Sequence, residues 1–184
     1  MPDLRQLLAP LLQGRVCLVG IGNVDYGDDG FGVRLAEALQ ASPIAAEVMI
    51  AGSAPERCLG RMTDAGFERV IFLDAVDFGG APGAVILLDA RELIARFPQV
   101  STHKLSLGLL ARQIEAQGRI RVWLLGVQPE SLKLRGALTP TIQTTLELLH
   151  ALLTAGAENC LPARAESPEP GSKPAETTLR EVLA

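Results

Sequence analysis

Three side chains stand where predicted strands end and helices begin, and their types could hold a cation or move a proton. Asp29 follows an apolar strand, Asp74 ends another, and His103 lies in a loop or in the first turn of a helix. Two carboxylates with one imidazole suit a borderline divalent metal and leave coordination positions open. A helix N-terminus disfavours imidazolium, so His103 would stay neutral, as a metal ligand must be. Both metal-assisted activation of water and a carboxylate general base without a metal remain open.

Each of these residues also has a structural interpretation. Asp74 could cap the element that follows its strand. Asp28 and Asp29 could both interact favourably with the positive end of a helix dipole. A single histidine at a helix start is more often structural than a ligand. The second histidine, His150, falls in the last predicted helix and is expected at the surface or rim. The residue types alone therefore do not separate a reactive site from ordinary helix starts.

The stretch that contains Asp29 is a glycine-rich turn between a strand and a helix. Residues 20–32 read Gly-Ile-Gly-Asn-Val-Asp-Tyr-Gly-Asp-Asp-Gly-Phe-Gly. Gly20 and Gly22 let the backbone turn tightly and let another group approach it closely. The dinucleotide fingerprint G-x-G-x-x-G fails because Asp25 stands at its third glycine, and Asp28 with Asp29 would repel phosphate. The turn instead fits a cation, or a substrate that carries one.

Composition and charge narrow the class of protein. The chain has 184 residues, of which 48% are hydrophobic and 4% aromatic, which predicts an aliphatic core. The formal net charge of −4 and the pI near 5.2 argue against nucleic acid as a partner. No apolar run reaches the ~18 residues of a membrane span, and residues 1–5 lack the order of a signal peptide. We therefore expect a cytoplasmic protein that contacts neither nucleic acid nor membrane.

The cysteines give no sign of a disulfide framework or a thiol enzyme. Cys17, Cys58 and Cys160 are scattered without CxxC spacing, which suits a reducing compartment. Cys17 falls mid-strand and is expected to be buried and inert. Cys58 falls in a first helical turn but has no histidine placed to activate it. A serine triad is disfavoured because no G-x-S-x-G elbow exists.

Strand-like and helix-like segments alternate along the chain, which predicts an α/β protein with an open, mostly parallel twisted sheet of about five strands and helices on both faces. Ligands of such sheets bind at the carboxyl ends of strands, where the strand order reverses. We expect one domain over residues 1–158, with 1–14 as a lead-in, and a proline-rich, solvated tail over 159–184. The expected strands are residues 15–20, 47–51, 69–74, 84–88 and 119–127.

Several residue types predict where the helices begin. Asp3 and Asp89 are expected to cap short helices, and Ser53 with Glu56 reads as a capping box. Ser101 or Thr102 is expected to cap the helix that follows His103. Thr139 with Pro140 is expected to open the last helix.

The ordered motifs resemble the hydrogenase maturation endopeptidases, which cut a C-terminal extension from the large subunit of nickel-iron hydrogenases. The resemblance covers residues 15–155, and the Ser-Ala-Pro-Glu segment and the Thr-His pair look closest to the branch that serves formate-hydrogenlyase-type hydrogenases. The motifs that carry it are the turn 20–32, Gly-Ser-Ala-Pro-Glu at 52–56, Val-Ile-Phe-Leu-Asp-Ala at 70–75, Pro-Gly at 82–83, Ser-Thr-His-Lys-Leu at 101–105, Gly-Val-Gln-Pro-Glu at 126–130 and Leu-Thr-Pro at 138–140.

The resemblance implies an enzyme, a peptidase, whose metal-contacting and catalytic residues are Asp29, Asp74 and His103. It implies that nickel arrives with the substrate, the nickel-iron hydrogenase large-subunit precursor, and that the protein holds no tightly bound cofactor of its own and acts as a monomer. Gly20, Gly22, Asn23 and Asp28 would line the substrate cleft, with Asp28 as a helix-start or supporting residue. The leader 1–14 and the tail 157–184 match nothing in the family.

Two readings from other classes compete with the peptidase. The first is a metal-sensing or chaperone-like binder of the large subunit, which would leave a nickel-loaded precursor at full length. The second is a nucleotide-binding Rossmann-like domain, which fails at Asp25 and lacks an acid at the end of the second strand for a ribose. Nucleotide-induced thermal stabilisation would revive this second reading.

Overall fold

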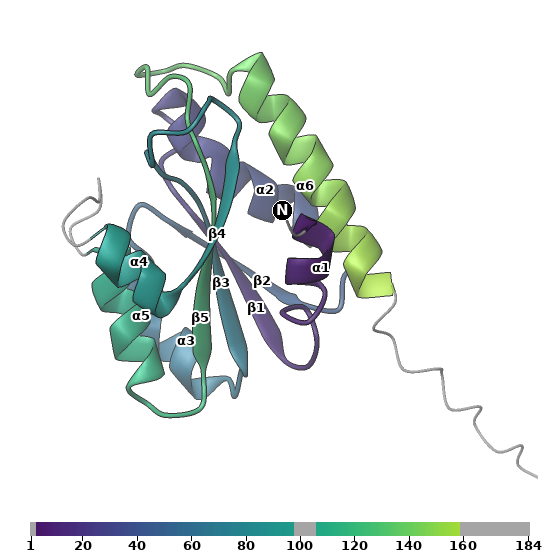
Figure 1. The fold of residues 1–184 in the computed structure, drawn as a ribbon, viewed down its shortest axis with the longest axis vertical. Coiled ribbons are helices and arrows are strands. Elements are labelled where there is room, and N and C mark those ends of the chain that lie inside the picture. The colour runs from purple at the N-terminus through teal and green to yellow at the C-terminus, as the bar shows by residue number, and fades with distance from the viewer. Residues whose placement is uncertain (1–2, 98–105, 159–184) are drawn as a thin grey trace, which may run out of the picture.

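The computed structural model describes residues 3–97 and 106–158, which form one sheet with helices on both faces (Figure 1). The predicted alternation of strands and helices is confirmed along the described chain. The last helix begins at Pro140, as predicted. In chain order the elements are α1 (Leu4–Leu8), β1 (Val16–Ile21), η1 (Gly27–Gly30), α2 (Phe31–Gln40), β2 (Glu47–Gly52), η2 (Pro55–Cys58), α3 (Leu59–Asp64), β3 (Arg69–Ala75), β4 (Val85–Asp89), α4 (Ala90–Arg96), α5 (Leu107–Glu115), β5 (Arg121–Val127) and α6 (Pro140–Glu158).

The sheet has the order β2-β1-β3-β5-β4, and its first four strands in that order run parallel. β4 pairs antiparallel with β5 at one edge of the sheet. The chain leaves β1 toward β2 on one side and returns to β3 on the other. The strand order therefore reverses between β1 and β3, and this is the point where ligands of such sheets bind.

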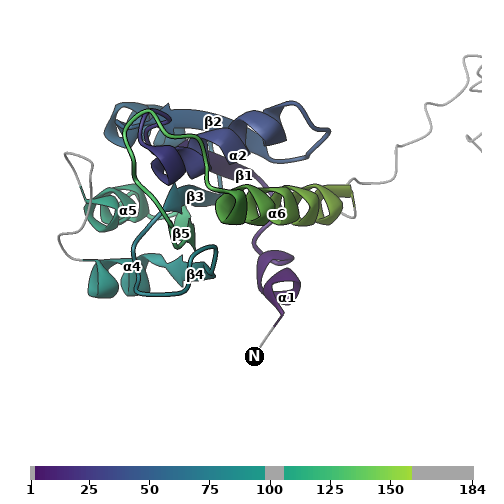
Figure 2. The same ribbon diagram turned by 90° about the horizontal axis from the view of Figure 1, so that it is seen from above.

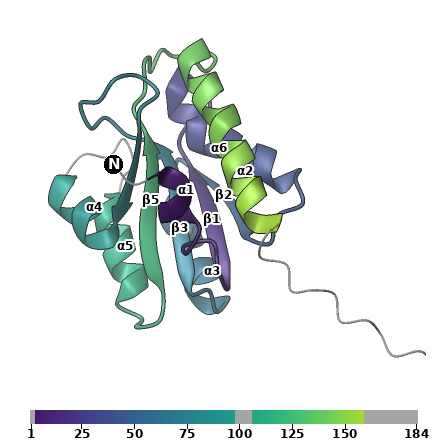
Figure 3. The same cartoon turned by 45° about the vertical axis from the view of Figure 1, so that its right-hand side comes forward.

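Two apolar cores hold the sheet between its helices. One face packs against α3, α4 and α5, and the other packs against α1, α2 and α6 (Figures 2 and 3). The central strands β1 and β3 bury nearly every side chain, because helices cover both of their faces. Cys17 of β1 is fully buried, as predicted. Burial raises the pKa of its thiol to about 12, so the group stays protonated and unreactive near neutral pH.

The helix starts confirm some predicted caps and correct others. Asp3 caps α1, and Asp89 with Glu92 forms a full capping box at α4. The capping box predicted for Ser53 and Glu56 is wrong: Ala54 stands at the cap of η2, which has no side-chain cap bond. Gly52, the last residue of β2, has a φ of +60°, and the helical segment begins at Pro55.

The start of α5 is also corrected. Ser106 is its N-cap, and the Ser106 side chain accepts a hydrogen bond from the Leu109 N–H, so neither Ser101 nor Thr102 caps this helix. His103 lies outside the described residues, so its predicted place in a loop or a first helical turn, and its neutral ring, stay predictions.

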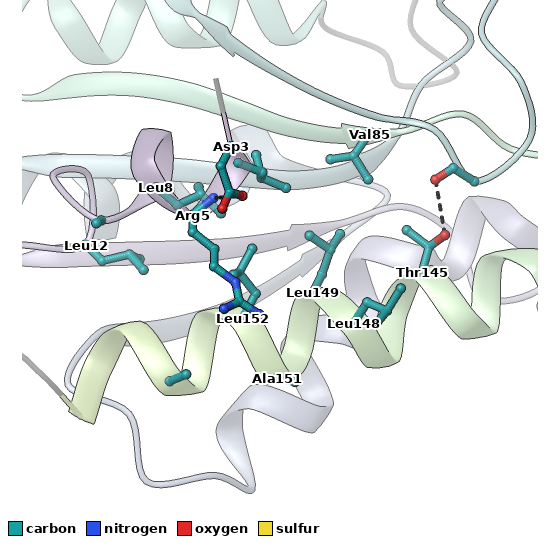
Figure 4. Close-up of a pocket in the computed structure, with 14 residues that line it drawn as sticks. Asp3, Arg5, Leu8, Leu12, Val85, Thr145, Leu148, Leu149, Ala151 and Leu152 are labelled. Carbon is teal, nitrogen blue, oxygen red and sulfur yellow. Dashed lines mark hydrogen bonds between the residues drawn. The ribbon is translucent and has the colours of Figure 1, made fainter. Parts of the chain in front are cut away.

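An apolar cavity of about 750 Å³ lies between α1, α6 and the edge strand β4 (Figure 4). Thr145 closes one end by donating its hydroxyl hydrogen to the Gly83 carbonyl oxygen. Its lining does not include Asp29 or Asp74, so this cavity is separate from the carboxylates at the strand ends. Within the described ranges, no helix is both long and apolar enough to cross a membrane.

Candidate functional site

Asp29 and Asp74 meet at the edge of the sheet where β1 and β3 end. Asp74 is the penultimate residue of β3, and Asp29 lies in η1, within the glycine-rich turn that follows β1. Both approach Gly22: a Cβ built on Gly22 would lie 1.8 Å from the Asp29 carbonyl oxygen and 3.7 Å from Asp74 Oδ1. Both carboxylates are nearly buried, with exposed fractions of 7% and 3%. The strand-end rule thus correctly places these two acids together.

Gly22 has the backbone that this approach requires. Its φ of +127° is a conformation that side-chain-bearing residues rarely adopt, and its N–H donates to the Gly52 carbonyl at 3.1 Å. The turn after β1 is therefore joined to the turn after β2. The space that a Gly22 side chain would fill is occupied by the backbone of Asp29, whereas the sequence predicts that Gly22 clears space for a substrate.

Gly20 has a different role from the one the sequence suggests. The sequence predicts that Gly20 lines the substrate cleft, but a Cβ on Gly20 would lie 2.5 Å from both the Ala36 Cβ and the Gly32 carbonyl oxygen. A Cβ on Gly32 would in turn lie 1.9 Å from the Leu73 carbonyl oxygen. These glycines let the start of α2 pack directly on the ends of β1 and β3, and this packing positions Asp29 beside Asp74.

The backbone holds the two carboxylates in place. Asp29 Oδ2 accepts a hydrogen bond from the Asn23 N–H at 2.9 Å, and Asp74 Oδ1 accepts one from the Ala75 N–H at 2.9 Å. Asn23 Oδ1 accepts from the Asp25 N–H at 3.0 Å, which fixes the turn. The Asn23 backbone N–H is therefore part of the site, where it binds the Asp29 carboxylate of the same chain.

His103 lies outside the described residues, so its place relative to the two acids stays a prediction. Within residues 3–97 and 106–158, no group of three or more His, Cys, Asp or Glu side chains could hold a metal ion. The described part of the chain therefore supplies two carboxylates. Such a pair can contact a cation that brings other ligands with it, or can accept a proton from water.

Asp28, the neighbour of Asp29, holds the loop between β5 and α6. Its side chain is fully buried, which agrees with the helix-start or supporting role predicted for it and does not fit a residue that lines a cleft. The carboxylate accepts hydrogen bonds from the N–H groups of Glu130 (2.9 Å), Ser131 (2.8 Å) and Thr139 (2.7 Å), and from the Thr139 hydroxyl at 3.1 Å. The adjacent acids therefore have separate roles.

Gln128 is a supporting residue that the sequence did not single out. It is nearly buried, and its side-chain oxygen accepts hydrogen bonds from the N–H groups of Phe78 (2.9 Å) and Gly80 (3.1 Å). Its Nε2 donates to Asp77 Oδ1 at 3.0 Å, and this hydrogen bond lowers the pKa of the Asp77 carboxyl. Gln128 thus fixes the loop that follows β3. The feature of the sequence that could have identified Gln128 is its position directly after a buried strand.

Comparison with known proteins gives the family. A family model of hydrogenase maturation proteases matches residues 33–155. The Hydrogenase 2 maturation protease of Escherichia coli K12 is 33% identical over 156 residues, which cover 78% of this chain and 94% of that protein. The Hydrogenase 3 maturation protease of the same strain is 31% identical over 137 residues, which cover 74% of this chain and 86% of that protein.

The fold agrees with this assignment. The crystal structure of the hydrogenase maturation protease HycI from Thermococcus kodakarensis superposes with a TM-score of 0.74 at 32% identity, over 83% of this chain and 99% of that one. Both comparisons match members of the same family, over 86–99% of those proteins' length. The chain therefore belongs to the hydrogenase maturation protease family and is a peptidase.

Proposed function

We propose that this peptidase removes the C-terminal extension of a nickel-iron hydrogenase large-subunit precursor after nickel insertion, and that it recognises the nickel bound to that substrate. The observation that carries the proposal is the pair Asp29 and Asp74, held together beside Gly22 at the reversal point of the sheet. Family membership supports the maturation of a hydrogenase.

Asp29 and Asp74 would act on the incoming precursor with carboxylate oxygens. Each carboxylate is oriented by a backbone N–H, from Asn23 and Ala75 respectively, so little reorganisation is needed when a cation arrives. Nickel is cargo of the substrate in this proposal, and the two acids complete the ligand set that the precursor leaves open. His103 would supply the third group.

The proposal predicts that nickel in the precursor decides whether cleavage occurs. Purified protein is incubated with precursor loaded with nickel or free of it, and the products are read by mass spectrometry. We expect loss of a C-terminal fragment from the loaded precursor alone. Equal cleavage of both forms would show that nickel is not recognised. Binding of the loaded precursor without shortening would show that this chain serves another step of maturation.

Variants test the assigned groups. Asp29→Asn, Asp74→Asn and His103→Ala should each reduce cleavage by at least about 100-fold, the scale seen when a positioned catalytic group is lost. Asp64→Asn, an exposed acid at the end of α3, is the matched control and should cleave like the parent. Full activity in Asp29→Asn, with an unchanged circular dichroism spectrum, would remove Asp29 from the site.

A further inference from the structure

Four large apolar side chains are exposed on two loops beside Asp29. They are Val24 and Tyr26 of the turn after β1, and Leu132 and Leu134 of the loop between β5 and α6. Within the described residues nine large hydrophobic side chains are exposed, and nearly half of them fall on these two short loops. We call Val24, Tyr26, Leu132 and Leu134 the two-loop patch. Tyr26 and Leu134 are exposed by 44% and 56%, which is enough to contact a partner.

The two loops form one unit although they are more than a hundred residues apart in sequence. They lie side by side above the sheet (Figures 1 and 2). The buried Asp28 carboxylate binds the N–H groups of Glu130 and Ser131, and the Arg135 N–H donates to the Asp25 carbonyl. A Cβ on Gly27 would lie 2.8 Å from the Ser131 carbonyl oxygen, so the backbones are in direct contact.

The turn that carries Val24 and Tyr26 is hydrogen-bonded to Asp29 of the candidate site. The Asp29 N–H donates to the Tyr26 carbonyl at 3.1 Å, and the Asn23 N–H donates to Asp29 Oδ2 at 2.9 Å. The same turn therefore carries both an acid of the candidate site and two of the exposed apolar side chains, Val24 and Tyr26. A protein substrate that brings its scissile segment to Asp29 must lie against or close to this turn.

We infer that the two-loop patch is the docking surface for the folded body of the hydrogenase large-subunit precursor, next to its processed C-terminal end; this inference rests on the proposed function. Exposed apolar side chains on a preformed surface are typical of protein-binding sites, and ordering loops in advance lowers the entropy lost on binding. The charges around the patch are mixed, with Asp25, Lys133 and Arg135 on the same loops. The partner surface should therefore be apolar at its centre and polar at its rim.

The test measures binding apart from cleavage. Asp29→Asn protein serves as a parent that does not consume the substrate, and its Kd for nickel-loaded precursor is measured by isothermal titration calorimetry. Adding Tyr26→Ser, or Leu132→Ser with Leu134→Ser, should weaken binding by at least about tenfold, the effect of losing one interface anchor. Leu148→Ser is the matched control, because Leu148 is 67% exposed on α6 and should leave the Kd unchanged. Leu134→Met should retain binding.

The outcomes separate this inference from the proposed function. Patch variants that bind like the parent, while wild-type protein still cleaves the precursor, would overturn the docking surface and leave the proposed function standing. Wild-type protein that cleaves no precursor would overturn the proposed function, and the binding measurement would still decide the patch. Size-exclusion chromatography with light scattering tests a third outcome. If the wild-type protein is a dimer and the patch variants are monomers, the patch binds a second copy of the chain instead.

Discussion

Asp28 and Ser131 are joined by two hydrogen bonds that run in opposite directions. The Asp28 N–H donates to the Ser131 carbonyl at 3.0 Å, and the Ser131 N–H donates to Asp28 Oδ2 at 2.8 Å. With the further bonds from Glu130 and Thr139, one buried carboxylate determines the position of the whole loop before α6.

Replacing this carboxylate should therefore be costly. Asp28→Ala leaves several backbone N–H groups without an acceptor, and we expect it to lower the free energy of unfolding by about 3–5 kcal/mol. Asp28→Asn keeps one acceptor oxygen and should cost about 2–3 kcal/mol. Urea denaturation at pH 7 measures both values. Asp25→Asn, an exposed acid of the same turn, is the control, and a loss below about 1 kcal/mol for Asp28→Ala would contradict the role of Asp28.

Gly22 and Gly79 provide a matched pair of positive-φ glycines. Gly22→Ala would place a methyl group 1.8 Å from the Asp29 carbonyl oxygen, whereas nothing lies within 4 Å of a Cβ at Gly79. We expect Gly22→Ala to lose more than about 4 kcal/mol or to fail to fold, and Gly79→Ala to lose about 1–2 kcal/mol from backbone conformation alone. Thermal unfolding followed by circular dichroism compares the two. Similar losses in both variants would show that the turn can open around Gly22.

Gln128→Ala should loosen the loop after β3 and change the titration of Asp77. Loss of the acceptor for the Phe78 and Gly80 N–H groups should cost about 1–3 kcal/mol. The Gln128 amide, and then the Gly79 N–H, lower the pKa of Asp77 below its usual 3.8, so the variant should raise this pKa. A carboxyl whose pKa is lower in the folded state stabilises the fold above its unfolded pKa and loses that contribution as pH falls through its folded pKa.

The part of the Gln128→Ala effect that acts through the Asp77 carboxylate should therefore be fully present at neutral pH, begin to fade near pH 3.8 and be lost as pH falls through the lowered folded pKa. An NMR titration of the Asp77 carboxyl carbon measures the pKa directly, and urea denaturation at pH 7 and pH 3 measures the stability. An unchanged Asp77 pKa in the variant would show that the Gly79 N–H is sufficient to lower it.

Cys17 and Cys58 should differ sharply in reactivity. Cys17 is fully buried with its pKa raised to about 12, whereas Cys58 is half-buried. In a Cys160→Ser background at pH 8, we expect an alkylating reagent to modify Cys58 while Cys17 reacts only as fast as the protein unfolds. Mass spectrometry of timed samples with and without urea follows both sites. Rapid labelling of Cys17 in native protein would mean that β1 opens locally.

Local sequence patterns predicted the sheet and the pairing of Asp29 with Asp74. Apolar runs and turn residues mark the strands, and the strand-end rule then places both acids at one edge without any knowledge of contacts. The predicted caps Asp3 and Asp89 were also confirmed, because a cap bond joins residues two or three apart in the chain.

The missed features depend on contacts between distant segments. The partners of Asp28 are 102 to 111 residues away, and Gln128 binds a loop about 50 residues away, so no local pattern reveals either. The sequence does not show how closely α2 packs on β1. The contact between Gly20 and Ala36 of that helix could therefore not be predicted, and the sequence instead suggests a substrate role for Gly20. The role of His103 stays a prediction, since it lies outside the described residues.

The bonds from Asp28 to Ser131 and Thr139 have a consequence for synthesis of the protein. A ribosome makes Asp29 and Asp74 in the first half of the chain, yet the loop fixed by Asp28 exists only after residue 139 has been added. A nascent chain can thus pair β1 with β3 before the neighbouring loop is anchored. The loop beside Asp29 can therefore take its described position only after residue 139 has been made, 111 residues after Asp28 itself.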